Sequence, residues 1–473
     1  MSTTFTYRKL PALLSARPLL AAAAATVLSF ILLLNIPRAS VTAARFIGEY
    51  GSKGELLSFT RAPSAFADAR EAAAWRAARA IDVAELIASN DSWRAGLAAA
   101  LLADGDDPFS TAVQGFARFG VWPIAFSRPL RYLSQRPPFA LAQSLASGAI
   151  AALGKTAEWS SVIPGNFSTY RFHGSEDAYY AQYRESWKAW TARKSGVDCN
   201  RHLEIVGNGA IPIFKNVGDI VPTTLYNYPK RLLAFALDNK DEKDEARLAT
   251  LRHFFLHWAH DHLSSVAHAQ YLTRAANFRA AVEGLPPIQL GTPGHRVVYI
   301  NERLPSEVDY MALFTLIGLI EWLGPENVDV LFPVPYLYEG GPTTCEGGAA
   351  LYGGGFGYAH YFPASFAKAH HDAEWIRETL RRGEYTAAVW GSIRRSDHMI
   401  DDAKVASAYA GKPHKLWLLD GEDEFNGWAP SRWWWWPHTW SRSGDYMFFA
   451  RELGTDSSGY HYAWGTSVIA TRR

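Results

Sequence analysis

The chain has 473 residues, of which 48% are hydrophobic and 20% are charged, and its formal net charge is +1. This hydrophobic share excludes wholesale disorder, and the near balance of charge argues against a nucleic-acid-binding protein, which would carry a basic face. The length is too great for one ordinary core and predicts two globular units with an appendage.

The amino-terminal region contains an uncharged apolar run, residues 19–36. As a helix this run would be about 27 Å long, close to the hydrocarbon thickness of a bilayer. Three basic residues and no acidic one precede it, which places residues 1–18 in the cytosol and the body in a lumen. A cleaved signal peptide is the alternative, because 41–43 (Val-Thr-Ala) resembles a cleavage site. The long flank favours a signal anchor, and hence a single-pass type II membrane protein facing the Golgi or ER lumen.

The cysteines and two glycosylation sequons also bear on the compartment. Only Cys199 and Cys345 occur, which excludes a disulfide scaffold and a Cys-rich zinc site and leaves a single bridge open. Asn90 and Asn166 each begin an Asn-X-Ser sequon, in keeping with a secretory glycoprotein.

The body is expected to begin with an alanine-rich helical stem or packing layer, 37–115. A first α/β domain, 116–286, should follow, and Pro286 and Pro287 mark the boundary to a second, 287–473. Short apolar runs alternate with helical patterns, which is typical of βαβ units and of two Rossmann-like domains. The expected strands are 121–126, 211–214, 328–332, 387–390 and 416–419.

A charged run, 239–247, predicts the solvated start of a long helix that continues toward Gly284. Four histidines fall within a stripe of about 80° on this helix, and their spacing is compatible with zinc. Large apolar residues cover the other faces, so the stripe is interpreted as the polar side of the helix, and no metal site is assigned. These residues are His253, His257, His260 and His268.

Residues 201–214 read RHLEIVGNGAIPIF, and their spacing suggests a specific chemistry. Gly209 predicts the end of a short helix that is followed by a buried parallel strand. Arg201 and Glu204 are three residues apart and therefore share a helix face, at a sheet edge where ligands of open α/β folds bind. The alternative is a surface ion pair on an ordinary helix–glycine–strand joint.

This stretch resembles the donor-binding motif of exostosin-like glycosyltransferases of the two-domain GT-B type, R-x-x-[E/D]-A-x-x-x-G-C-I-P-V. Ile205 and Ala210 depart from the pattern, standing where the family has alanine and cysteine. Segments 198–200 and 228–230 are also similar to uncharacterised glycosyltransferase-like proteins of algae and large viruses. The matching residues are Arg201, Glu204, Gly209, Ile211 and Pro212, with Asp219 and Pro222 in rough agreement.

The resemblance implies a GT-B-like pair of Rossmann-type domains, with 116–286 binding the donor and 287–473 on the acceptor side. The family carries this motif in its carboxy-terminal domain, so the domain order here would be swapped, or a domain added. Glu204 would accept the donor's hydroxyls, Arg201 with Lys194 or Arg193 would stabilise its diphosphate, and Gly209 would allow close backbone approach.

The function implied is that of a membrane-anchored luminal glycosyltransferase. It would transfer a sugar from a nucleotide-sugar donor to a glycan or glycoprotein acceptor, with inversion and with no required cofactor. One alternative is a non-catalytic glycan-binding or scaffold protein with the same fold, and another is a histidine-ligated metal enzyme.

Three further patterns bear on the acceptor side. The strand 416–419 runs into an acidic cluster in which Asp420 and Asp423 are the candidate catalytic bases, with a solvated acidic loop as the alternative. Residues 353–357 (Gly-Gly-Gly-Phe-Gly) are interpreted as a flexible turn or an active-site lid. Four tryptophans predict a sugar-stacking acceptor platform, with a membrane-interface contact or a buried joint as alternatives. They are Trp433, Trp434, Trp435 and Trp436.

Overall fold

In the computed structural model, the described part of the chain belongs to one compact unit, 62–473. The structure describes the ranges 69–89, 91–105, 121–137, 140–146, 148–172, 174–194, 196–220, 223–292, 294–395, 399–423 and 444–452. The predicted anchor 19–36 and the tryptophans 433–436 lie outside these ranges. Within them, no helix has the length and apolar character needed to cross a membrane.

The larger sheet has six strands, all parallel, in the order β1-β9-β8-β7-β5-β6. Each strand is short and apolar because both of its faces are buried. Strand β1 comes from the range expected for the first domain, yet it pairs with β9 near the end of the chain. The strands are Val121–Pro123 (β1), Val297–Ile300 (β5), Val328–Val330 (β6), Ala387–Trp390 (β7), Leu416–Asp420 (β8) and Met447–Ala450 (β9).

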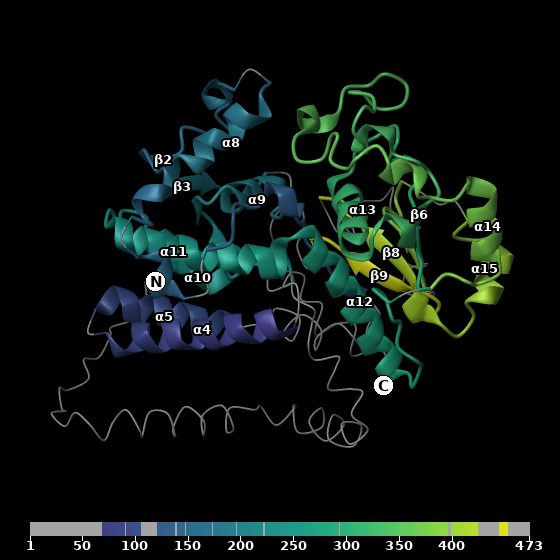
Figure 1. Cartoon of the computed structure of the whole chain (residues 1–473), viewed down its shortest axis with the longest axis horizontal. Helices are drawn as coiled ribbons and strands as arrows, with labels where there is room; N and C mark the ends of the chain where they lie inside the picture. The colour runs from purple at the N-terminus through teal and green to yellow at the C-terminus, as the bar shows by residue number, and fades with distance from the viewer. Residues whose placement is uncertain are drawn as a thin grey trace, which may run out of the picture. The chain divides into compact units, whose positions relative to one another are not determined.

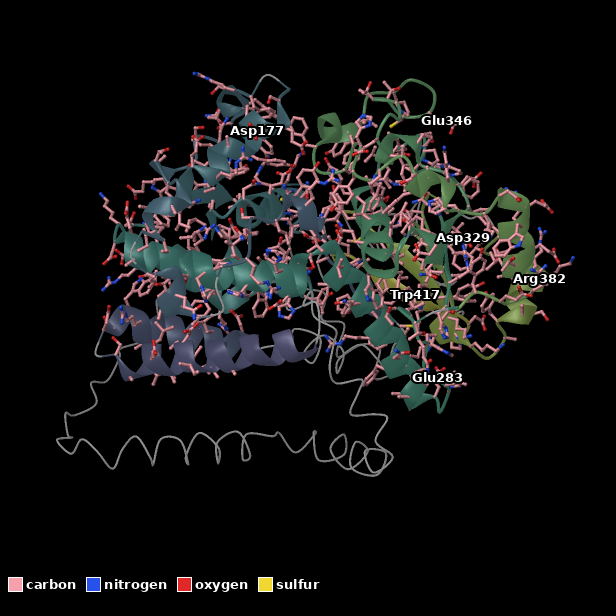
Figure 2. The ribbon with its side chains drawn as sticks, viewed as in Figure 1. Asp177, Glu283, Asp329, Glu346, Arg382 and Trp417 are labelled. Carbon is pink, nitrogen blue, oxygen red and sulfur yellow. The ribbon has the colours of Figure 1, made fainter. Side chains whose placement is uncertain are left out.

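Helices cover both faces of this sheet (Figure 1). Helices α12 (Ser265–Val282) and α13 (Tyr310–Leu323) pack on one face, and α14 (Ala373–Arg381) and α15 (Ala403–Ala408) pack on the other. Alternate strand residues point to the two cores, as in Trp417 of β8, which is fully buried on the α12 side (Figure 2). The mixed α/β, Rossmann-like character predicted for this part is therefore confirmed.

The chain reverses its direction of travel across this sheet between β5 and β7. From β5 it moves outward to β6, and from β7 it moves the other way through β8 to β9. Ligands of open α/β folds bind outside the carboxyl ends of such strands. The residues that follow β5 and β7 lie at this reversal, and those that follow β8 and β9 lie along the same carboxyl edge of the sheet.

The smaller sheet has three parallel strands in the order β2-β3-β4. Helix α8 joins β2 to β3 and α9 joins β3 to β4, and α9 ends just before Gly209, whose φ of 74° confirms the predicted glycine stop. The elements are Ala157–Trp159 (β2), Ser186–Thr191 (β3), Ile211–Phe214 (β4), Glu176–Arg184 (α8) and Asn200–Gly207 (α9).

Further helices pack beside the smaller sheet (Figure 1). The predicted alanine-rich helical segment forms two helices, α4 and α5, of which α5 packs on α10. Asp104 at the end of α5 accepts hydrogen bonds from the first amides of α10, Arg231 and Leu232, at 2.9 and 2.8 Å. The bounds are Ala69–Ala88 (α4), Ser92–Asp104 (α5), Leu141–Ser144 (α7), Lys230–Asp238 (α10) and Glu245–Trp258 (α11).

The histidine-bearing helix differs from its prediction in two ways. It is broken, because α11 passes into a π-helical turn, Ala259–Leu263, and then Ser264 adopts an extended conformation and caps α12. The histidine stripe was also predicted to be the polar side of the helix, but most of it is buried. His253 and His268 are buried, with hydrogen bonds to Ser144 and Thr315 at 3.0 and 3.1 Å.

Burial lowers the pKa of His260 and of His268 to about 4, so both rings are neutral near pH 7. Across the described ranges, no group of three or more His, Cys, Asp or Glu side chains is arranged to hold a metal ion. Two histidines of the stripe join helices through hydrogen bonds, His253 to α7 and His268 to α13.

Candidate functional site

The carboxyl ends of the two sheets meet at Asp198. This residue lies on the loop between β3 and α9, and Arg451 and Glu452 follow directly after β9. Arg451 Nη1 donates to the main-chain oxygen of Asp198 at 2.6 Å, and the Asp198 amide donates to Glu452 Oε1 at 2.6 Å. The two edges at which α/β folds bind ligands are thus joined to each other.

The Asp198 side chain is only partly satisfied at this junction. Its Oδ2 accepts a hydrogen bond from the Phe126 amide at 2.7 Å, whereas its Oδ1 has no partner among the described residues. Burial raises the pKa of this carboxyl to about 6, which is the range in which a carboxylate can exchange a proton near neutral pH.

Glu204 lies on α9 and its side chain is buried, with 8% of the residue exposed. Tyr179 Oη donates to its Oε2 at 2.6 Å, and Asn200 Nδ2 donates to its Oε1 at 3.1 Å. Burial, together with the charge of Glu204, raises the pKa of Tyr179 well above its ordinary value, so this hydroxyl remains a donor. A carboxylate accepts about four hydrogen bonds, so each Glu204 oxygen keeps acceptor capacity for a ligand.

Arg201 lies half-buried on the same helix, and within the described ranges it forms no ion pair with Glu204. Its Nη2 donates to Tyr170 Oη at 2.5 Å, and its Nε is buried with no hydrogen-bond partner among the residues described. The interpretation as an ordinary surface ion pair is therefore wrong for these two residues. Each instead keeps unused hydrogen-bonding capacity in a buried setting.

The other predicted donor-binding residues have different surroundings. Gly209 lies against the Arg252 guanidinium, since a Cβ built on Gly209 would be 2.9 Å from Arg252 Nε. Its positive φ and this contact each explain why glycine occupies the position, without any contribution from a ligand. Arg193 and Lys194 lie on the loop after β3, and Lys194 is exposed. Their role in donor binding stays a prediction.

Arg128 is a residue of this region that sequence reasoning missed. It lies in the segment after β1, has no exposed surface, and donates from Nε to the Tyr132 main-chain oxygen at 2.9 Å. Its guanidinium carbon is 4.7 Å from the ring centre of Tyr180. Burial acts to lower the pKa of Arg128, but the neighbouring Tyr180 and Glu204 outweigh it and the pKa rises. The guanidinium is therefore a permanent charge beside Glu204.

The glycine-rich segment 353–357 packs on the same helix as Tyr179 and Tyr180. Phe356 stacks on Tyr179 with ring centres 6.1 Å apart, and the Gly357 amide donates to Glu176 Oε1 at 2.6 Å. The segment thus covers the aromatic side of the Glu204 site, which is where a lid would lie. Movement of this segment stays a prediction.

The two predicted catalytic carboxylates lie after β8 and are held by arginines. Asp420 is buried and accepts from Arg394 Nε and Nη2 at 2.8 and 2.5 Å. Asp423 has a half-exposed side chain and accepts from Arg451 Nη2 at 2.5 Å. Because Arg451 also binds Asp198, the structure brings Asp423 to the junction near Glu204's helix. Asp420 forms a separate pair.

No protein-family model, curated protein or solved structure matches this chain. The resemblance of 201–214 therefore depends on the residues of that stretch alone.

Proposed function

We propose that this chain is a glycosyltransferase that binds a nucleotide-sugar donor around Glu204 and transfers the sugar to a glycan or glycoprotein acceptor. The observation that carries the proposal is the Glu204 carboxylate itself. It is buried, positioned by Tyr179 and Asn200, and retains acceptor capacity beside two arginines. Vicinal hydroxyls of a ribose or a sugar are matched donors for such a carboxylate.

The position of the site also supports the proposal. Helix α9 connects parallel strands of one sheet, and its amino-terminal end is hydrogen-bonded to residues that follow β9 of the other. A donor held on α9 would therefore lie beside carboxylates from the second sheet. The GT-B resemblance implies two α/β domains with the donor bound between them, and a junction between the carboxyl edges of the two sheets is compatible with that arrangement.

In the proposed reaction, the acceptor oxygen attacks the anomeric carbon as the bond from that carbon to the diphosphate oxygen breaks. The bonding electron pair leaves with the diphosphate, and a carboxylate takes the acceptor proton. Asp198 is the strongest candidate for this base, because its Oδ1 has no partner among the described residues and its pKa is about 6. Asp423 is the alternative at the junction, and Asp420 stays a prediction.

The direct test is calorimetric titration of the purified full-length chain with a panel of nucleotide sugars and free nucleoside diphosphates. Glu204→Gln is expected to weaken binding of the preferred donor at least tenfold, because it removes a charge-assisted acceptor worth about 1.5–3 kcal/mol. Glu378→Gln, on the exposed face of α14, is the matched control and should bind as the unmodified chain does.

Two results would count against the proposal. One is that no nucleotide sugar binds, and the other is that a folded Glu204→Gln protein keeps full affinity. Binding on a glycan array without any nucleotide binding would instead support a scaffold or lectin. Membrane anchoring and a Golgi or ER location belong to the same proposal, and they concern residues outside the described ranges.

A further inference from the structure

Arg128 carries more unused hydrogen-bonding capacity than any other residue named at the junction. Both Nη1 and Nη2 are buried and have no hydrogen-bond partner within the part of the chain that the structure describes. A buried charge without hydrogen bonds is costly unless another group satisfies it. The fold nevertheless positions this side chain firmly, through Nε and the rings of Tyr132 and Tyr180.

The surroundings of Arg128 contain a second buried donor and, among the described residues, no carboxylate in an ion pair with the arginine. Tyr180 Oη is buried and lies beside Arg128 and Glu176, but it forms no hydrogen bond of normal geometry with a described residue. The charges of Glu204 and Glu176 favour the charged form of Arg128, and neither carboxylate forms an ion pair with it among the described residues. Two guanidinium nitrogens and a hydroxyl are therefore left as donors around one place.

Two glycines pack against this place. A Cβ on Gly207, in the last turn of α9, would lie 2.8 Å from Arg128 Cδ, so the arginine stem runs directly along the α9 backbone. A Cβ on Gly357 would lie 3.9 Å from Arg128 Nη1 and 3.5 Å from Tyr180 Oη. The free donors therefore face the glycine-rich segment 353–357, and a ligand would reach them where that segment packs.

We propose that Arg128 binds the diphosphate of the donor through Nη1 and Nη2, with Tyr180 Oη as a third donor. This inference rests on the proposed function and assigns to Arg128 the diphosphate contact for which sequence reasoning had named Arg201 with Lys194 or Arg193. The planar fork of a guanidinium matches two phosphate oxygens, and its charge stabilises the diphosphate as the electron pair of the breaking carbon–oxygen bond moves onto it.

The experiment uses inorganic pyrophosphate as the probe, titrated into the full-length chain by calorimetry. Arg128→Lys keeps a positive charge but loses the fork, and it should weaken pyrophosphate binding at least tenfold, while Arg128→Met should abolish it. Lys194→Met should change binding less than threefold. Arg279→Met is the matched control for loss of a buried arginine, because Arg279 of α12 is already bound to Glu283 and to the Tyr446 oxygen.

Thermal denaturation identifies which variants remain folded. If Arg128→Met does not fold, pyrophosphate binding by Arg128→Lys tests the inference on its own. Unchanged pyrophosphate binding in a folded Arg128 variant would overturn the inference. Nucleotide-sugar binding that is lost in Glu204→Gln but kept in Arg128→Lys would overturn it while leaving the proposed function standing. Pyrophosphate binding that depends on Arg128, without binding of any nucleotide sugar, would overturn the proposed function and, with it, the assignment of the anion to a donor.

Discussion

Replacing Arg451 by methionine is expected to lower the free energy of unfolding by about 3–5 kcal/mol, the range measured when a buried ion pair loses one partner. Arg451 is buried and donates to the main-chain oxygens of Gly421 and Asp198 at 2.7 and 2.6 Å and to Asp423 at 2.5 Å. Its guanidinium also lies 3.4 Å from the buried Glu452 carboxylate. Methionine fills a similar volume but leaves these acceptors unpaired.

Arg382→Met is the matched control for this substitution. Arg382 lies at the end of α14 (Figure 2), and both it and its partner Glu384 are about half exposed. Exposed pairs contribute about 0–1 kcal/mol, so the control should change little. Urea denaturation of the full-length chain measures both variants. Equal losses in the two proteins would show that the Arg451 network does not hold the two sheets together.

Replacing Gly318 by alanine is expected to destabilise the chain by about 3 kcal/mol, at the upper end of the usual cost of overpacking. Gly318 lies on α13 where it crosses α12, and a Cβ there would be 2.0 Å from the Ser265 main-chain oxygen. A backbone atom cannot rotate away as a side chain can, so the two helices must separate. The gain of about 1 kcal/mol from alanine's higher helix propensity offsets only part of this.

Gly218→Ala provides the comparison for that substitution, because a Cβ at Gly218 would meet no atom within 4 Å and its φ is not positive. Gly218→Ala should change the free energy of unfolding, measured by urea denaturation, by no more than about 0.5 kcal/mol, as most surface substitutions do. If Gly318→Ala were as stable as Gly218→Ala, the close crossing of α12 and α13 would not describe the folded protein.

The strands could be predicted from sequence because buried parallel strands read as short apolar runs. The runs 211–214 and 387–390 match β4 and β7 residue for residue, and 328–332 differs from β6 only in its end. The short helix before Gly209 was predictable for a similar reason, since a glycine stop is a local signal. The pairing of β1 with β9 was not predictable, because no local pattern links strands so far apart.

The histidine helix shows why the rest could not be read from sequence. Periodicity groups the histidines on one face, but it does not tell whether that face meets water or other helices. Here it meets Ser144 and Thr315, so the polar stripe is buried and hydrogen-bonded. The break at Ser264 also has no helix-breaking glycine or proline to announce it.

Only one part of the candidate site, the motif on α9, could be predicted from the sequence. Arg201 and Glu204 are local to one motif, whereas Arg128 follows β1 and reaches the site only through the fold. Nothing in the sequence around Arg128 separates it from a surface arginine. Its significance comes from burial and from two unpaired nitrogens, which are properties of the packed structure.

The measurement that tests the central claim most directly is hydrogen–deuterium exchange of the full-length chain with and without each nucleotide sugar of the panel. Slower exchange in α9, over residues 200–207, and in the segment 351–357 on addition of one donor is the result expected if the donor lies on Glu204 beneath the glycine-rich segment. Slowing confined to the residues after β5 and β7, or no change with any donor, would contradict the placement of the site at Glu204.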